Sequence, residues 1–150
     1  MKLFIFFLLI LLDYFTKKVI FQVVDLNNFI AVLPFMDITH IHNYGISFGL
    51  FSGIFPAWII ISIGAILTIF IVYWMFRITN TIEKWGFLFI ITGAVSNLGD
   101  RIINDYVLDF IYIHYKGFYW PAFNFADIYI TIGVFIIIYQ NIMIFKKKYD

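Results

Sequence analysis

The sequence predicts an all-α membrane protein, a four-transmembrane-helix bundle that carries a small extracytoplasmic β element on the membrane surface. The chain of 150 residues is 63% hydrophobic and 13% charged, whereas soluble domains are roughly 45–50% apolar and about 25% charged. Its apolar residues gather in four long segments, and the two long connections between these segments fall on one side of a four-span chain. Without a linker or an internal repeat, residues 1–150 are expected to form a single integral-membrane domain.

The four apolar segments come close to the ~20 residues that a transmembrane helix requires. The expected spans are residues 3–24, 55–76, 85–99 and 126–145. The first segment begins like a signal peptide, but it lacks a small-residue cleavage pattern and the chain stays apolar beyond Lys18. We therefore expect this segment to be retained as the first span.

Lysine and arginine residues near the spans indicate the orientation of the chain. Four spans place both termini on one side, where six of these residues lie, against four on the other side. The terminal side holds Lys2, Arg77, Lys84 and Lys146 to Lys148, and the opposite side holds Lys17, Lys18, Arg101 and Lys116. This excess predicts cytoplasmic termini and places the two long connections outside.

The first long connection, residues 25–54, contains signals for short strands. Apolar and polar residues alternate around Phe35 to Ile41, and Asn43-Tyr44-Gly45 is typical of a turn. We expect a small sheet that lies on the outer membrane surface and is too short to fold as a separate domain.

Polar residues inside the apolar segments are expected to have a structural or functional role, because a charge at the bilayer centre costs ~2.5–3.5 kcal/mol on insertion scales. Asp13 and Lys17 are four residues apart on one helix face, where they form either a structural ion pair or the support of a site. Asn97, Asp100 and Arg101 stand at the outer end of the third span. A guanidinium beside free helix carbonyls favours contact with a ligand over simple capping.

Two aspartates occupy apolar sequence on the side of the long connections. Asp109 lies within "VLDFI" and Asp127 within "FNFADIYI". Taken singly, Asp109 fits a surface-loop carboxylate and Asp127 fits a first-turn acid that favours the helix dipole. Taken together, two carboxylates close to each other in an apolar site share one proton near neutral pH. This arrangement is typical of aspartic peptidases, in which one carboxylate activates water and the other donates a proton.

Other functions have weaker support. The chain has no cysteine, and its net charge of +1 gives no sign of nucleic-acid binding. His40, His42 and His114 show no HExxH pattern, so no metal and no cofactor are expected. A small ion- or proton-coupled membrane transporter is the alternative, because intramembrane Asp and Lys residues also line ion pathways; it predicts carboxylates near the bilayer midplane and two related halves. A non-catalytic membrane assembly factor, in which Asp109 would be dispensable, is the third reading.

Five sequence blocks occur in the order found in one known family: "DYFTK", "NYGISFG", "SNLGDR", "VLDF" and "FNFAD". On these blocks, which extend over nearly the whole chain, the sequence resembles the lipoprotein signal peptidases, or signal peptidase II. The resemblance implies an aspartic endopeptidase of the bacterial inner membrane with its active site near the outer face. It implies removal of the signal peptide from diacylglyceryl-modified prolipoproteins, on the N-terminal side of the lipidated cysteine.

The resemblance also assigns residues and partners. The family's catalytic pair falls on Asp109 and Asp127. The residues that line or support the substrate pocket fall on Asn43, Asn97, Asp100, Arg101, Asn124, Asp13 and Lys17. Ser96 and His42 stand where the family commonly has glycine and arginine. The implied partners are the prolipoprotein, membrane lipid and, as inhibitors, cyclic peptide antibiotics of the globomycin type.

Overall fold

The computed structural model describes residues 1–46 and 54–149, which form four long helices and four strands. The helices are α1 (Lys2–Val23), α2 (Ala57–Arg77), α3 (Thr81–Asn104) and α4 (Phe125–Tyr149). The strands are β1 (Phe29–Leu33), β2 (Met36–Asn43), β3 (Val107–Tyr115) and β4 (Phe118–Tyr119). The end of the block "NYGISFG", residues 47–49, lies outside the described residues.

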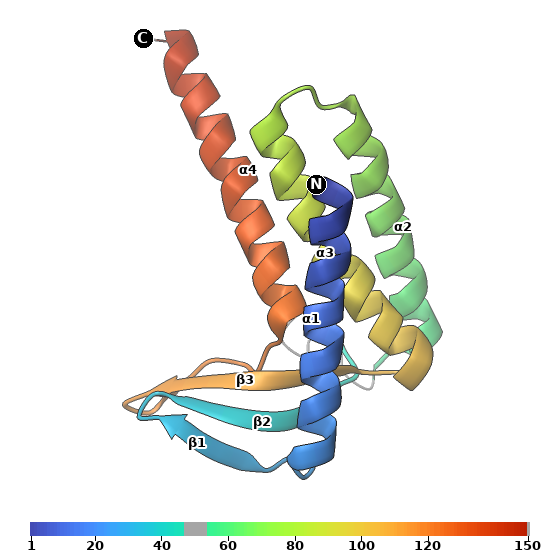
Figure 1. The fold of residues 1–150 in the computed structure, drawn as a ribbon, viewed down its shortest axis with the longest axis vertical. Coiled ribbons are helices and arrows are strands. Elements are labelled where there is room, and N and C mark those ends of the chain that lie inside the picture. Colours follow the sequence, from blue (N-terminus) through green and yellow to red (C-terminus); the bar gives the residue numbers. More distant parts are fainter. Residues whose placement is uncertain (47–53, 150) are drawn as a thin grey trace.

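The helices run alongside one another and the sheet lies across one end of them (Figure 1). Successive helices alternate in direction, so both termini lie at the end away from the sheet. α3 packs against each of the other three helices. Its approach to α4 is close, since a Cβ on Gly93 would meet the backbone carbonyl oxygen of Ala126. Glycine therefore sets the spacing of these two helices beside the start of α4.

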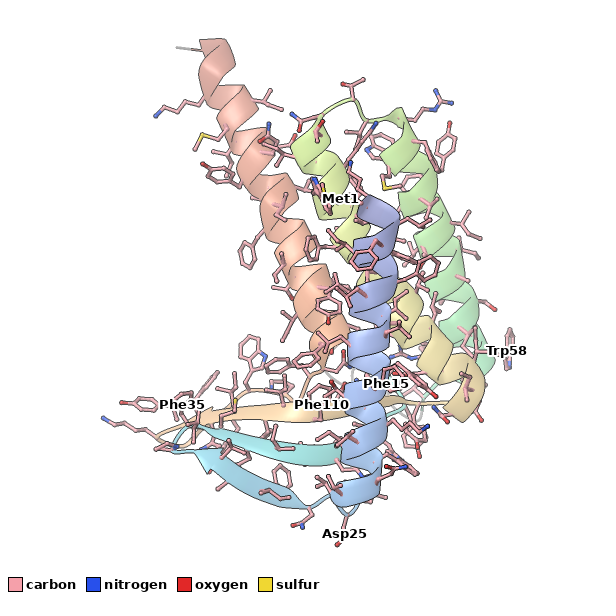
Figure 2. The ribbon with its side chains drawn as sticks, in the orientation of Figure 1. Met1, Phe15, Asp25, Phe35, Trp58 and Phe110 are labelled. Carbon is pink, nitrogen blue, oxygen red and sulfur yellow. The ribbon has the colours of Figure 1, made fainter. Side chains whose placement is uncertain are left out.

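Three helices in the described part of the chain are long and apolar enough to cross a membrane: α2, α3 and α4 as far as Lys146. α1 has 22 residues, but every stretch of 18 residues within it contains Asp13, Lys17 and Lys18. Large apolar side chains such as Ile66 and Phe135 are exposed, and Figure 2 shows side chains that project outward all along the helices. An apolar outer surface of this kind is typical of helices that face lipid. The membrane class is confirmed, whereas the passage of α1 through the bilayer stays a prediction.

α3 is longer than the span of residues 85–99 predicted for it. The Asn80 side chain accepts hydrogen bonds from the backbone N–H groups of Ile82 and Glu83, so the helix begins at a polar cap instead of at the first apolar residue. At its other end the chain leaves through Asp105, whose φ of 66° is left-handed. The polar cap and the last turns extend the apolar segment in both directions.

The sheet is antiparallel with the strand order β1-β2-β3-β4. The strands expected in the first connection are present, while β3 in the second connection was not predicted. The first five residues of β3 are all buried, because the sheet packs onto the end of the bundle there. Phe110 lies in this junction (Figure 2), in a core formed with Ile20, Val24, Leu108 and Ile111. This core fixes β3 against the C-terminal end of α1.

Candidate active site

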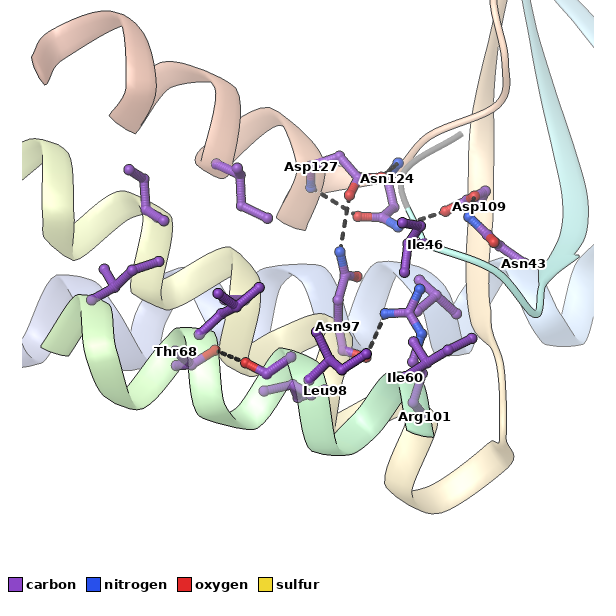
Figure 3. A pocket seen from close by; sticks show the side chains of 18 residues that line it. Asn43, Ile46, Ile60, Thr68, Asn97, Leu98, Arg101, Asp109, Asn124 and Asp127 are labelled. Atoms are coloured by element: carbon purple, nitrogen blue, oxygen red, sulfur yellow. Dashed lines mark hydrogen bonds between the residues drawn. The ribbon is translucent and has the colours of Figure 1, made fainter. Parts of the chain in front are cut away.

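Asp109 and Asp127 reach the same cavity from different elements. Asp109 is the third residue of β3, and Asp127 is the third residue of α4. Both line a cavity of about 360 Å³ whose other walls come from α2 and α3 (Figure 3). Asp109 is only 3% exposed. The two carboxylates that the sequence singled out are therefore brought together at one buried site.

Asn124 joins the two aspartates and is itself fully buried. Its side-chain Nδ2 donates to Asp109 Oδ1 at 2.6 Å. Its Oδ1 accepts from the backbone N–H of Asp127 at 3.0 Å, and its own backbone N–H donates to Asp127 Oδ2 at 3.2 Å. This reciprocal pair is a capping box at the start of α4. The same residue that starts the helix thus holds both carboxylates in place.

Each carboxylate has a further amide donor. Asn43 Nδ2 donates to Asp109 Oδ2 at 2.9 Å, and Asn97 Nδ2 donates to Asp127 Oδ1 at 2.9 Å. The orientation of each amide is set by a partner of its carbonyl oxygen. Asn43 Oδ1 accepts from the Gly45 backbone N–H, while Asn97 Oδ1 accepts from the Lys17 ammonium at 3.2 Å. These contacts therefore orient the amide donors toward Asp109 and Asp127, which we call the dyad.

Lys17 is the centre of a buried charge cluster under the dyad. Its Nζ lies 2.7 Å from Asp13 Oδ2 and 2.6 Å from Asp100 Oδ2, with only 5% of the residue exposed. The i, i+4 pairing of Asp13 and Lys17 expected from the sequence is present, and the second carboxylate of the cluster, Asp100, comes from α3. Because a buried charge without a partner is strongly unfavourable, the three groups stabilise one another and tie α1 to α3.

Asp13 also binds two groups outside the charge cluster. Ser96 Oγ donates to Asp13 Oδ2 at 2.6 Å, and the Ala126 backbone N–H donates to Asp13 Oδ1 at 3.1 Å. Asp13 therefore connects α1 to α3 and to the first turn of α4. Ser96, which stands where the family commonly has glycine, thus supplies a hydroxyl that donates a hydrogen bond to the Asp13 carboxylate.

Arg101 stands between the dyad and the segment that follows β2. Its Nη2 donates to the Gly45 carbonyl oxygen at 2.6 Å, and its Nη1 donates to the Asn97 carbonyl oxygen at 3.4 Å. Arg101 lines the cavity, and its buried Nε has no hydrogen-bond partner among the described residues. The Nε–H group is thus a buried donor that no described residue accepts.

Burial, and after it the nearby Asp127 carboxylate, raise the pKa of the Asp109 carboxyl to about 7. The hydrogen bonds from Asn43 and Asn124 act in the opposite direction because they stabilise the ionised form. The effects of burial and of the Asp127 charge outweigh those of the two amide hydrogen bonds, so the pKa of Asp109 is raised. The pair can therefore hold one proton near neutral pH, as a carboxylate dyad requires.

All the site residues predicted from the sequence belong to one connected network of hydrogen bonds and ion pairs. The sequence reasoning did not identify the apolar wall of the cavity, which α2 supplies through Ile60, Ile63, Gly64, Leu67 and Thr68. Nothing in the apolar run of α2 distinguishes this face from the face toward lipid. In the described ranges no group of three or more His, Asp or Glu side chains is placed to hold a metal ion.

Comparison with known proteins identifies the family of this chain and supports its fold. The family model described as "Signal peptidase (SPase) II" matches residues 5–143. The lipoprotein signal peptidase of Thermodesulfovibrio yellowstonii is 38% identical over 137 residues, 91% of this chain and 90% of the relative. That of Wigglesworthia glossinidia brevipalpis is 38% identical over 133 residues, 87% of each chain. A solved "Bacterial membrane enzyme structure" aligns with a TM-score of 0.86 at 29% identity, over 95% of this chain and 87% of that one.

Proposed function

This chain belongs to the signal peptidase II family, whose members process lipoprotein signal peptides, and on that premise we propose that it is an aspartic endopeptidase with Asp109 and Asp127 as its catalytic pair. Its substrates are diacylglyceryl-modified prolipoproteins. It cleaves the peptide bond on the N-terminal side of the lipidated cysteine. The observation that carries this proposal is the placement of two carboxylates in one cavity, held by a shared asparagine.

The environments of the two carboxylates suggest how they divide the reaction. Asp127 sits in the first turn of α4, where the helix dipole favours a negative charge. Asp109 has a pKa near 7 because it is buried beside that charge. We therefore assign the resting proton to Asp109 and the role of general base to Asp127.

The chemistry then follows in two steps. Water attacks the carbonyl carbon of the scissile bond, one of its protons passes to Asp127, and Asp109 gives its proton to the carbonyl oxygen, so that a gem-diol forms. In the second step Asp127 returns the proton to the amide nitrogen as the C–N bond breaks. A hydroxyl of the gem-diol gives its proton back to Asp109, which restores the starting state.

The cavity suggests how the substrate is held. Its α2 wall is apolar, as expected for a site that receives a membrane-embedded peptide and its acyl chains. Arg101 lines the cavity, and its guanidinium is a donor group suited to a backbone carbonyl of an extended peptide. Cyclic peptide antibiotics of the globomycin type would compete for the same space. The transporter alternative finds less support, because the elements that carry the dyad, β3 and the first turn of α4, lie at the sheet end of the bundle (Figure 1).

We extend the proposal to the topology of the chain in the bacterial inner membrane. α1 crosses the bilayer as a fourth span in spite of its charges, because Asp13 and Lys17 are buried against α3 and do not face lipid. Both termini are then cytoplasmic, and the sheet and dyad lie near the outer face. This arrangement keeps the chain a single integral-membrane peptidase domain.

The direct test is substitution of the dyad. Asp109→Asn, Asp127→Asn and the double variant should each lose at least ~10³-fold in cleavage rate on a lipidated prolipoprotein, and the double variant little more than either single one. Asp105→Asn is the matched control, because Asn tolerates the left-handed backbone at this position. Folded yield in detergent is measured in parallel. A folded Asp109→Asn protein that cleaves at the wild-type rate would refute the assignment.

A further inference from the structure

Two histidines on β2 lie directly beside the dyad network without belonging to it. His40 is 4% exposed, and its Nδ1 is 2.8 Å from the carbonyl oxygen of Val24 at the end of α1. His40 Nε2 is 3.0 Å from His42 Nε2. The residue after His42 is Asn43, which donates to Asp109. The end of α1 is thus linked to Asp109 through His40, His42 and the neighbouring Asn43.

The protonation of both rings follows from their partners. The Val24 carbonyl oxygen can only accept, so His40 Nδ1 must carry the hydrogen. In a neutral His40 ring Nε2 is then an acceptor, and the short contact requires His42 Nε2 to be the donor. His40 is therefore in the Nδ1–H form and His42 in the Nε2–H form. Burial and the neighbouring His40 lower the pKa of His42, which keeps its ring neutral at ordinary pH.

The His42 ring is held on its other side by Tyr106. The two rings are stacked with centroids 3.5 Å apart and planes 16° from parallel. Tyr106 precedes β3, and the first residue of that strand, Val107, pairs with Asn43 in the sheet register. The edge of the Tyr44 ring also contacts His42 at 6.2 Å between centroids. His42 thus joins the ends of both strands that carry Asn43 and Asp109.

We propose that His42, oriented by His40 and stacked on Tyr106, is a positioning residue that fixes Asn43 against Asp109. His42 does not touch the reacting atoms and acts through the amide of Asn43. The proposal rests on the proposed function, because it takes Asp109 as catalytic. It assigns to His42 two separable contributions, an N–H donor toward His40 and a flat ring toward Tyr106.

The first test concerns the tautomers and does not depend on catalysis. The chain has three histidines, so ¹⁵N-histidine labelling gives three rings whose ¹H–¹⁵N two-bond couplings report the tautomer. At about two pH units above the ordinary histidine pKa of ~6.5, His40 should be Nδ1–H and His42 Nε2–H. His42→Gln and His114→Gln spectra provide the assignment. A His40 ring in the Nε2–H form would overturn the proposal.

The second test separates positioning from general stability. His42→Leu should lower kcat about tenfold or more with KM within about twofold, because a small displacement of catalytic groups slows the reaction step. His42→Gln keeps an N–H donor for His40 but loses the ring on Tyr106, so its kcat should lie between those of His42→Leu and wild type. His114→Gln, on the same sheet but paired with Asp37, is the control and should have no effect.

The outcomes distinguish this inference from the proposed function. A His42→Leu protein with wild-type kcat overturns the positioning role, even when Asp109→Asn is inactive. Equal losses in His42→Leu and His42→Gln overturn it as well, because the donor would then contribute nothing. An active Asp109→Asn protein instead refutes the proposed function and leaves the tautomer measurement intact.

Discussion

Replacing Asn124 by serine tests how the amide donors tune the dyad. Serine retains a good N-cap for α4, while its shorter side chain cannot reach Asp109 Oδ1. A hydrogen bond to a charged acceptor contributes roughly 1.5–3 kcal/mol, and one to a neutral acceptor roughly 0.5–1.5 kcal/mol. The difference of about 1–1.5 kcal/mol corresponds to about one pKa unit. Because the lost bond stabilised the ionised form, the pKa of Asp109 should rise from about 7 by about one unit.

The assay is the pH dependence of kcat/KM on a lipidated prolipoprotein, which reports ionisation in the free enzyme. If Asp109 must be protonated to act, wild-type activity falls as pH rises through about 7. In Asn124→Ser this alkaline limb should move about one pH unit higher, whatever happens to the maximal rate. Asn141→Ser is the matched control. Asn141 lies at the far end of α4, where its side-chain amide donates a hydrogen bond to Glu83. An alkaline limb that stays in place or moves to lower pH would refute the reasoning.

Three further expectations follow from the same structure. Asp13→Asn should lower the unfolding midpoint in detergent, since it leaves Lys17 with one carboxylate and weakens the cap on Ala126; an unchanged midpoint would show that this cluster contributes no stability. Gly93→Ala should destabilise the fold by about 1–3 kcal/mol, because its Cβ meets the Ala126 carbonyl oxygen, whereas Gly99→Ala has open space and serves as the control. A reporter active only in the periplasm, fused after Asp150, should give no signal, and a strong signal would reverse the proposed orientation.

The carboxylates and amides of the site could be predicted because each polar residue stands out against apolar neighbours. Asp109, Asp127 and Asn97 show this signal without any reference to a family, and the family blocks add Asn43 and Asn124. The role of Asn124 as a bridge could not be predicted, because it depends on β3 and α4 meeting at one residue. Membership in a network is a property of the packed chain and not of the spacing of residues in the sequence.

Strand β3 shows why part of the fold could not be predicted. A strand on a membrane surface usually alternates between apolar and polar residues, but the first residues of β3 are buried on both faces. Its apolar run is therefore indistinguishable from helix or loop sequence. The start of α3 did have a signal, because Asn80 precedes Glu83 by three residues in the manner of a capping box. This cap signal places the start of the third helix near residue 81, before the predicted span of residues 85–99.

The contact between Asp13 and the Ala126 N–H joins residues 113 positions apart in the chain. Because Asp127 follows Ala126 directly, this contact fixes the proposed catalytic carboxylate of Asp127 against the first helix. A chain that ended before α4 would lack Asp127, the second carboxylate of the proposed pair. On the proposed function, proteolytic activity would therefore require the last helix to be in place against the first.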